Sequence, residues 1–367
     1  MNSKKEKHPR RRRVVFISLA VLILAGGLWI IQVGLPWVKG IQAYMYAFPL
    51  IVMEHTREVS TAVPTAGEIS APTNQFAVMT EYPDASFRLV PRTGLDTKFA
   101  TAWADLSEEP LVLSVPNTQG QYYVIALFDM WSNVFASIGN RTTGIDSFNF
   151  LITGPNWKGS VPEGFKEVYA SPTRYVWVNG QMQSSTVEDH DVVNDLQKQY
   201  KLSPLSSWGQ SFDYPSVVAV DPDVDIKTPV LEQIRNMTAG EFWSLFAGLM
   251  IDNPPTAEDA EIVEKLNFLG IIPGNDFDIN SVKPKLAHAL ERSMRTFNLL
   301  EKGVQKLETK EGWIVIPENF ANYGTDYLTR AGIAHIILGN PGFSIVGFKN
   351  QLLFKNLVSP RPTFRQG

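Results

Sequence analysis

The chain has 367 residues, of which 19% are charged and 44% hydrophobic, and its net charge is −4. This composition is typical of a folded protein and excludes a disordered one. The sequence contains no cysteine, which excludes disulfide bonds, thiolate chemistry and zinc sites of the cysteine type.

The first 38 residues predict a membrane anchor. Residues 1–13 carry seven cations, and residues 14–31 form an 18-residue run with nothing more polar than Ser18. A helix of that length covers about 27 Å, close to the roughly 30 Å hydrocarbon core of a bilayer. Because cations favour the cytoplasmic side, we expect residues 1–13 in the cytoplasm, residues 14–38 in the inner membrane and the remainder in the periplasm. A cleaved signal peptide is the alternative, although its apolar region usually has only about 7–15 residues.

The part of the chain beyond this tail is acidic. Without the seven cations and Glu6, 26 basic and 36 acidic residues remain, a net charge of −10. An acidic surface repels phosphate groups, so we predict no nucleic-acid partner. The length beyond the anchor suffices for two domains of ordinary size.

The apolar pattern beyond the anchor predicts one helix and then a series of strands. Apolar residues recur near a 3.6-residue period over residues 39–59, and Pro49 is expected to kink or restart this helix. Short strands separated by Pro, Gly and Asn follow, as in an antiparallel sandwich. The expected strands are Leu111–Val115, 121–130, Phe148–Thr153, Glu167–Ala170 and 173–178. The first two are expected to pair as a hairpin across residues 116–120.

From residue 186 the pattern becomes helical. Thr186 followed by Asp189 is typical of a capped helix start, and further helices are expected over residues 238–250, 256–269 and 282–307. We therefore predict an α+β fold with five parts. They are a basic cytoplasmic tail (1–13), a transmembrane anchor (14–38), a β-sandwich-like, antiparallel β-rich domain preceded by a helix (39–185), a mainly helical region (186–340) and an atypical basic tail (341–367).

Seven short blocks, taken in order, resemble a known bacterial family. They are AYMYAFPL (43–50), ADLSEEP (104–110), YY with FD (122–123 and 128–129), GNRTTG (139–144), GPNW (154–157), PLS (204–206) and YGTDYLTR (323–330). Their succession across residues 40–340 is similar to the family called domain of unknown function 1254. The resemblance implies a β-rich first domain and a helical middle, but no chemistry.

The same resemblance implies that a domain is missing. In most members of the family a second β-sandwich, domain of unknown function 1214, follows the block at 323–330. Here the family pattern holds through residues 338–341 and then stops, and the last acidic residue of the chain is Asp326. We interpret residues 341–367 as the product of a frameshift or premature stop. A natural short form with its own basic tail is the alternative.

The strongest candidate binding residues lie around residue 130. Asp129, Trp131 and Asn133 alternate along the predicted strand and would share one face, which Tyr123 and Arg141 are expected to approach. A carboxylate, an indole, an amide and a guanidinium around one concavity suit a sugar or another polyhydroxylated ligand. In the alternative interpretation, Trp131 is a core residue, and Asp129 and Asn133 bond the backbone of a turn.

No pattern identifies catalysis, a metal site or a cofactor. Asp105, Glu108, Glu109 and Asp129 could supply the paired carboxylates of a glycosidase, but their spacing selects no pair. His190, within residues 188–191, is better explained as part of a solvated helix start than as a metal ligand. The sequence also has no His-x-x-x-His pair, no Gly-x-Ser-x-Gly elbow and no phosphate-binding glycine loop.

Three classes of function therefore stay open. The first, which we favour, is a membrane-anchored envelope protein that binds a small polar or envelope-derived ligand. The second is a carbohydrate- or lipid-directed hydrolase or lyase whose site needs the missing second domain. The third is a structural or assembly protein, and self-association into a homo-oligomer is compatible with each class.

Overall fold

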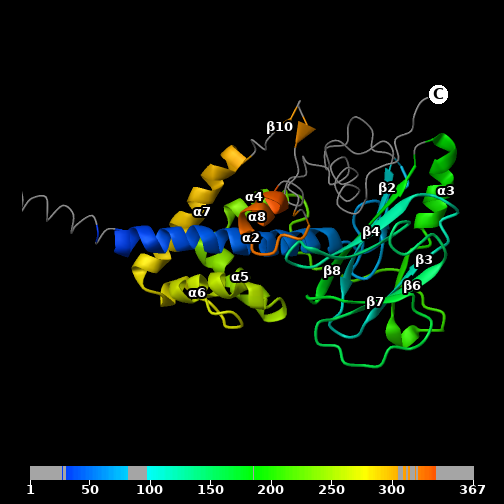
Figure 1. Cartoon of the computed structure of the whole chain (residues 1–367), viewed down its shortest axis with the longest axis horizontal. Helices are drawn as coiled ribbons and strands as arrows, with labels where there is room; N and C mark the ends of the chain where they lie inside the picture. Colours follow the sequence, from blue (N-terminus) through cyan, green and yellow to red (C-terminus); the bar gives the residue numbers. More distant parts are fainter. Residues whose placement is uncertain are drawn as a thin grey trace, which may run out of the picture.

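The computed structural model describes residues 27, 30–81, 97–184, 186–304, 309–310, 313–314, 319 and 321–335. Figure 1 shows an α+β protein in which a helical region and a β-sheet region lie side by side along one long helix, α2. Most of the predicted anchor and all of the tail at 341–367 lie outside the described residues. None of the helices in the described ranges is both long and apolar enough to span a bilayer.

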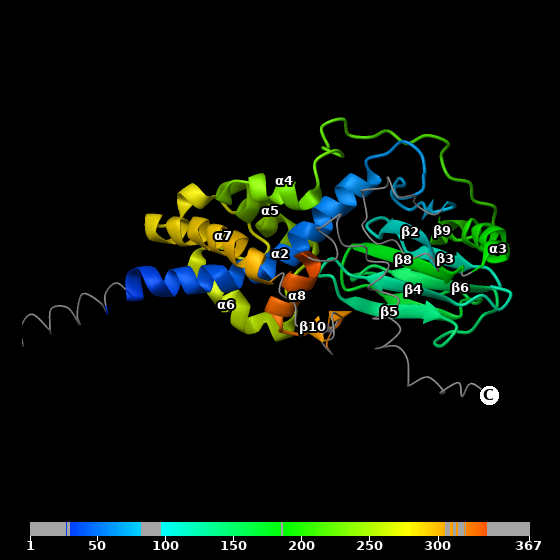
Figure 2. The ribbon, with the colours of Figure 1, turned by 90° about the horizontal axis from the view of Figure 1, so that it is seen from above.

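Helix α2 (Leu35–Thr61) confirms the predicted amino-terminal helix and connects the two regions. It follows one π-helical turn, η1 (Ile30–Gly34), and contains Pro49 in its interior. Proline removes one helical hydrogen bond and crowds the preceding turn, which bends a helix. Figure 2 shows α2 changing direction partway along its length while remaining one element. Its middle, from Ala43 to Glu54, is almost entirely buried.

The strands form two main sheets. Their bounds are β1 (Ala77–Val78), β2 (Thr97–Asp105), β3 (Leu111–Val115), β4 (Tyr123–Phe128), β5 (Val134–Gly139), β6 (Phe148–Thr153), β7 (Glu167–Ala170), β8 (Tyr175–Gln183) and β9 (Lys201–Pro204). The first sheet has the order β1-β2-β8-β4-β5 and is antiparallel; the second has the order β7-β6-β3-β9, with β6 and β7 parallel. A short pair, β10 (Thr309–Lys310) and β11 (Trp313–Ile314), stands apart.

The two main sheets pack face to face around an apolar core. This core takes side chains from both sheets, among them Ile125, Leu127 and Val178 from the first and Leu113 and Phe150 from the second. On the outer face of the first sheet, Trp103, Phe128 and Trp177 join a second core that belongs to the helices. The first sheet is therefore the layer shared by both halves of the molecule.

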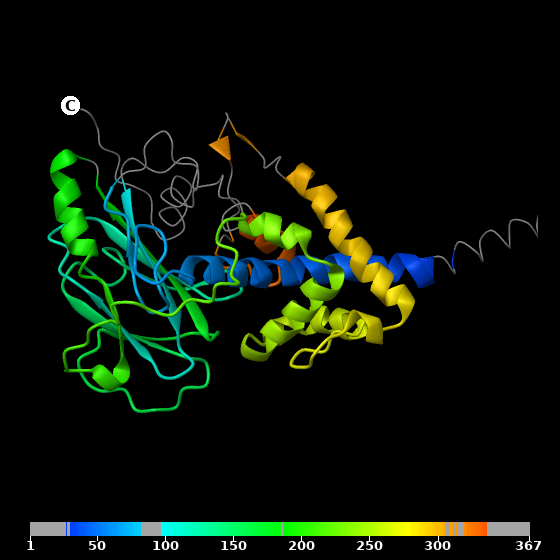
Figure 3. The ribbon, with the colours of Figure 1, turned by 180° about the vertical axis from the view of Figure 1, so that it is seen from behind.

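The remaining helices pack around α2, except for α3. They are α3 (Val187–Gln197), α4 (Val230–Asn236), α5 (Ala239–Asp252), α6 (Ala260–Leu269), α7 (Pro284–Val304) and α8 (Tyr327–Ile333), with the short turns η2 (Leu205–Ser207), η3 (Ala257–Asp259) and η4 (Ile279–Ser281). Figure 3 shows α4 to α8 surrounding α2, while α3 lies beside the sheets. The predicted helix start at Thr186 is confirmed, because Thr186 and Asp189 form a complete capping box. His190 lies in the first turn of that helix.

One sequence prediction about connectivity needs correction. The hairpin across residues 116–120 is wrong: β3 pairs with β6 and β9 in one sheet, whereas β4 pairs with β5 and β8 in the other. The connection instead crosses between sheets, turning through Gln119 and Gly120, which both have positive φ. Strand β9, which lies beyond residue 185, completes the second sheet, and α2 packs in the helical core.

Candidate functional site

Residues 129–133 form the turn between β4 and β5 and are not part of a strand. The Asp129 N–H donates to the Asn133 carbonyl at 2.9 Å, the Ser132 N–H donates to the Asp129 carbonyl at 3.0 Å, and Ser132 has a φ of +64°. A reversing backbone ends the strand periodicity, so the expected alternation of Asp129, Trp131 and Asn133 on one strand face is wrong.

The Asp129 carboxylate organises this turn. Its Oδ1 atom accepts hydrogen bonds from the N–H groups of Trp131 and Asn133, each at 2.9 Å. Its Oδ2 atom accepts from the Asn133 side-chain amide at 3.1 Å. Aspartate commonly bonds the backbone two residues further on in this way. The turn-capping role that the sequence analysis kept as the alternative is therefore confirmed as the local geometry.

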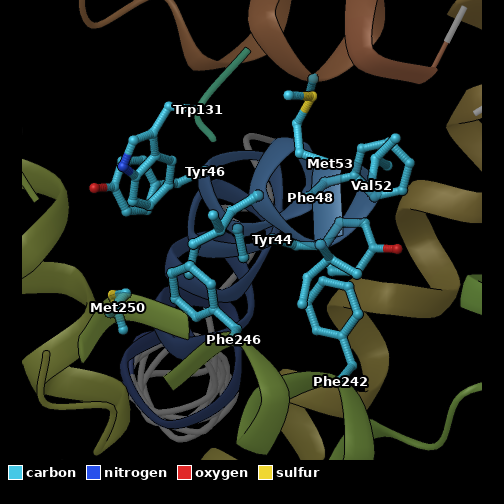
Figure 4. Close-up of a cluster of buried hydrophobic side chains, with 14 of the residues drawn as sticks. Tyr44, Tyr46, Phe48, Val52, Met53, Trp131, Phe242, Phe246 and Met250 are labelled. Atoms are coloured by element: carbon cyan, nitrogen blue, oxygen red, sulfur yellow. The ribbon is translucent and has the colours of Figure 1, made fainter. Parts of the chain in front are cut away.

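Trp131 is a core residue at the junction of sheet and helices. Its side chain is 5% exposed, and its ring centroid lies 4.7 Å from that of Tyr46 on α2 and 6.5 Å from that of Phe246 on α5. Figure 4 shows the Trp131 and Tyr46 rings lying against each other. The indole thus contributes to packing between two regions that are distant in the sequence.

Tyr123 and Arg141 lie at the opposite end of β4. Tyr123 is buried between the sheets, and its hydroxyl donates to the Gly144 carbonyl at 3.0 Å. Arg141 is exposed, with its guanidinium 5.8 Å from the centroid of the Tyr122 ring. Because Tyr123 and Asp129 are separated by the whole of β4, about 20 Å at the usual strand rise, the five predicted residues do not form one concavity.

A different set of side chains surrounds the turn, and we call it the joint cluster. It consists of Tyr46, Asp129, Trp131, Asn133, Asp259, Tyr327 and Arg330, with Ser132 of the turn. The Tyr327 ring centroid lies 5.0 Å from that of Tyr46, and the Tyr327 hydroxyl donates to Asp259 at 2.8 Å. The blocks at 43–50, 128–129 and 323–330, which carry the family resemblance, meet here. Only that resemblance pointed to Tyr46 and Arg330, since neither stands in a motif with known chemistry.

Arg330 supplies a buried positive charge to the joint cluster. Its side chain belongs to α8 and is 5% exposed, and its Nη2 atom donates to the Gly324 carbonyl at 2.6 Å. The guanidinium also lies 5.5 Å from the centroid of the Tyr327 ring. A buried cation is costly unless it is bonded or paired, so Arg330 depends on these neighbours.

Burial raises the pKa of the Asp129 carboxyl to about 6, from an ordinary value of 3.8. The bonds from Asn133 and Trp131 and the charge of Arg330 act in the opposite direction but do not cancel the loss of water. Burial, helped by the nearby Asp259 carboxylate, likewise raises the pKa of the Tyr46 hydroxyl. The Asp129 carboxyl therefore titrates near neutral pH.

Several buried polar atoms of the joint cluster have no hydrogen-bond partner among the residues that the structure describes. They are Tyr46 Oη, Ser132 Oγ, Asn133 Oδ1 and Arg330 Nε. Buried polar groups are nearly always bonded, because a missing bond costs about 1–3 kcal/mol. Water, a ligand or an undescribed part of the chain is needed to complete the hydrogen bonds of these four atoms.

We expect Asp129→Asn to change how stability depends on pH. Between about pH 4 and 6 the folded protein holds a proton on Asp129 that the unfolded chain releases, so the free energy of unfolding falls as pH rises through this range. The shift corresponds to about 3 kcal/mol, which is lost above pH 6. The asparagine side chain of the variant keeps an oxygen for the two N–H donors and carries no charge. Urea unfolding should therefore show the variant gaining about 3 kcal/mol relative to the wild type from pH 4 to 7.

Asp105→Asn is the matched control for this measurement. Asp105 is bonded by Arg174 at 2.9 Å and by the Ser107 N–H, and these bonds lower the pKa of its carboxyl despite partial burial. Its ionised form stabilises the folded state, so Asp105→Asn should lose stability relative to the wild type as pH rises towards about 4 to 5, and its difference from the wild type should stay constant above that pH. Parallel profiles for the two variants would contradict the assignment of a raised pKa to Asp129.

No group of three His, Asp or Glu side chains in the described ranges could hold a metal ion. Two of the carboxylates considered for catalysis have structural bonds: Asp105 binds Arg174, and Glu109 accepts from the Ser206 hydroxyl and N–H.

Comparisons with known proteins give a family and a fold. Residues 73–204 match the family described as "Protein of unknown function (DUF1254)", so a domain of this family is present in the chain. A solved structure, that of the VPA0106 protein from Vibrio parahaemolyticus, is similar with a TM-score of 0.56 and 21% identity. The similarity covers 84% of this chain and 68% of that one, and it concerns the fold. No protein with a curated description matches the sequence.

Proposed function

We propose that this chain is a membrane-anchored envelope protein that binds a small polar ligand at the joint cluster. One observation carries the proposal: four buried polar atoms of Tyr46, Ser132, Asn133 and Arg330 have no partner among the described residues. The anchor rests on the apolar run at residues 14–31 of the sequence, together with its seven cations.

The four atoms define the kind of ligand. Arg330 Nε can only donate, Asn133 Oδ1 accepts, and the hydroxyls of Tyr46 and Ser132 can do either. A compound with both hydroxyl and carbonyl or carboxylate oxygens would match this set. Sugars, sugar acids and the polar headgroups of envelope lipids have this chemistry. The packed rings of Trp131 and Tyr46 lie beside this set of atoms.

A thermal melt of the full-length chain against such compounds tests the proposal. A compound present at 100 times its Kd should add about 2.7 kcal/mol to the stability of the folded state. Tyr46→Phe removes one hydrogen bond to the ligand and should weaken binding about tenfold, which reduces this added stability to about half. Without ligand, the stability of the same variant should stay within about 1 kcal/mol of that of the wild type, because only a hydroxyl beside the Asp259 carboxylate is lost.

Tyr200→Phe is the matched control for Tyr46→Phe. The Tyr200 hydroxyl is also buried and has no partner among the described residues, but it lies in the core between the sheets. Its removal should leave every ligand-induced shift unchanged. Equal responses of the two variants, or no shift with any sugar, sugar acid or headgroup compound, would contradict binding at the joint cluster.

One observation favours the hydrolase or lyase alternative. The pKa of Asp129, about 6, suits a general acid or base near neutral pH. Both Asp129 oxygens, however, already accept hydrogen bonds from the turn, which leaves the carboxyl poorly placed to exchange a proton with a substrate. For this reason we place binding ahead of catalysis. Turnover of a ligand found in the melts, abolished by Asp129→Asn, would reverse that order.

A further inference from the structure

An apolar surface lies at the end of the helical region where α2 begins. Its exposed side chains come from η1 and α2 and from the end of α6 and the residue segment after it, and each is 45–57% exposed. They are Ile31, Leu35, Val38, Phe268 and Ile272, and we call them the end surface. Single exposed apolar residues are ordinary, but a group at one end of a molecule indicates an interaction.

The packing of α6 on α2 brings these residues to the same end. Near the start of α6, Asp259 lies beside Tyr46 of α2 and bonds Tyr327. At the other end of α6, the Phe268 ring lies 4.9 Å from the Lys39 ammonium. Helix α6 therefore runs antiparallel to α2, back towards its first turns. Gly270, with a φ of +90°, ends α6, so Ile272 follows at that end of the bundle.

Helix α7 covers only the opposite side of this part of α2. Trp37 Nε1 donates to Thr296 on α7 at 3.2 Å, and Arg292 lies 4.2 Å from the centroid of the Trp37 ring. A side chain added at Gly40 would come within 3.1 Å of Ala289 and Ser293. This contact buries one face of α2 and leaves Leu35 and Val38 on the other face exposed to solvent.

We propose that the end surface lies against a lipid bilayer, with Phe268 and Ile272 in the headgroup layer. The inference rests on the proposed anchor: the apolar run ends at Ile31, and the end surface begins there. The headgroup layer on each side of a bilayer is roughly 5–8 Å thick, about the rise of one helical turn or slightly more. Side chains beside residues 35–39 lie at this depth if residues 14–38 form the anchor.

Cations beside the end surface fit the same partner. Lys39 lies over Phe268, and Lys285 at the start of α7 donates to Gln32 at 2.7 Å. Lysines at a membrane boundary extend their ammonium groups towards phosphate while their stems cover apolar surface. Asp276 and Asp278 are exposed on the loop between α6 and α7, and their negative charges repel an anionic lipid. Apolar contact therefore has to provide most of the attraction.

Labelling with single cysteines tests this surface, because the natural chain has none. Full-length Phe268→Cys, Ile272→Cys and Val217→Cys would each carry an environment-sensitive dye in vesicles of phosphatidylethanolamine and phosphatidylglycerol with a spin-labelled lipid as quencher. Val217 is 67% exposed and belongs to the segment between η2 and α4, so it serves as the matched control. We expect strong quenching at 268 and 272 and little at 217.

The results distinguish a failure of the proposed bilayer contact from a failure of the proposed anchor. Suppose that the labelled chains float with the vesicles, but the dyes at positions 268 and 272 are quenched no more than the dye at position 217. The anchor is then supported, and the proposed bilayer contact of the end surface is wrong. If the full-length chain does not float with vesicles, the anchor fails and the contact fails with it. Ligand binding at the joint cluster is read from the melts and does not depend on either result.

Discussion

Trp131→Ala is expected to lower the free energy of unfolding by about 3–5 kcal/mol, the usual loss for a large aromatic residue removed from a core. The side chain is 5% exposed and packs on Tyr46 and Phe246, so its removal opens a cavity where sheet and helices meet. Urea unfolding of the full-length chain, followed by far-ultraviolet circular dichroism, would measure the loss. Trp131→Phe should retain part of the packing and lose clearly less.

Trp208→Ala provides the comparison for this tryptophan. Trp208 follows η2, stacks on Phe165 at 4.5 Å and donates to the Glu163 carbonyl at 3.3 Å, and it belongs to neither apolar core. Its removal should cost much less than that of Trp131. Equal costs would show that the joint between sheet and helices adds little stability. A stable Trp131→Ala variant that had lost only ligand binding would support the open stacking face first expected from the sequence.

The elements that the sequence predicted best depend on local interactions. The strands Leu111–Val115, Phe148–Thr153 and Glu167–Ala170 have the expected bounds because turn residues stand directly at their ends. The predicted cap at Thr186 likewise involves two residues only three positions apart. By contrast, the expected strand at 173–178 continues to Gln183 as β8, through buried Asn179 and Gln181. The polar residues and a glycine interrupt the apolar pattern, so the sequence does not predict this part of the strand. Its burial depends on distant parts of the chain.

Strand pairing and the candidate site were less predictable for the same reason. Nothing in residues 111–130 shows that β3 and β4 belong to different sheets, since both are mainly apolar and could face either way. Turn chemistry made the role of Asp129 predictable as an alternative. The meeting of this turn with Tyr46 and Arg330 depends on the packing of α2 and α8 against the first sheet, which no local pattern encodes.

Replacing Arg330 by methionine is expected to cost about 1.5–3 kcal/mol at pH 7, the usual contribution of a hydrogen bond that involves a charged group. The change removes the donor to the Gly324 carbonyl and the cation that lowers the pKa of Asp129. Without that cation the pKa of Asp129 should rise above 6, so the carboxyl stays protonated to higher pH. The cost of Arg330→Met should therefore be smaller at pH 5, where Asp129 is protonated with or without Arg330, than at pH 7.

The double variant Arg330→Met with Asp129→Asn shows whether the two groups act on each other. In the double variant the carboxylate that Arg330 compensates is absent. At pH 7 its free energy of unfolding should therefore be about 1 kcal/mol higher than the sum of the two single-variant changes predicts. At pH 5 this difference should nearly vanish. Arg330→Lys retains the charge but not the planar fork and should lie between Arg330→Met and the wild type. Additive losses with the same values at both pH values would mean that Arg330 supports α8 through packing and its bond to Gly324 alone, and that the ligand site must be explained without a charge at its centre.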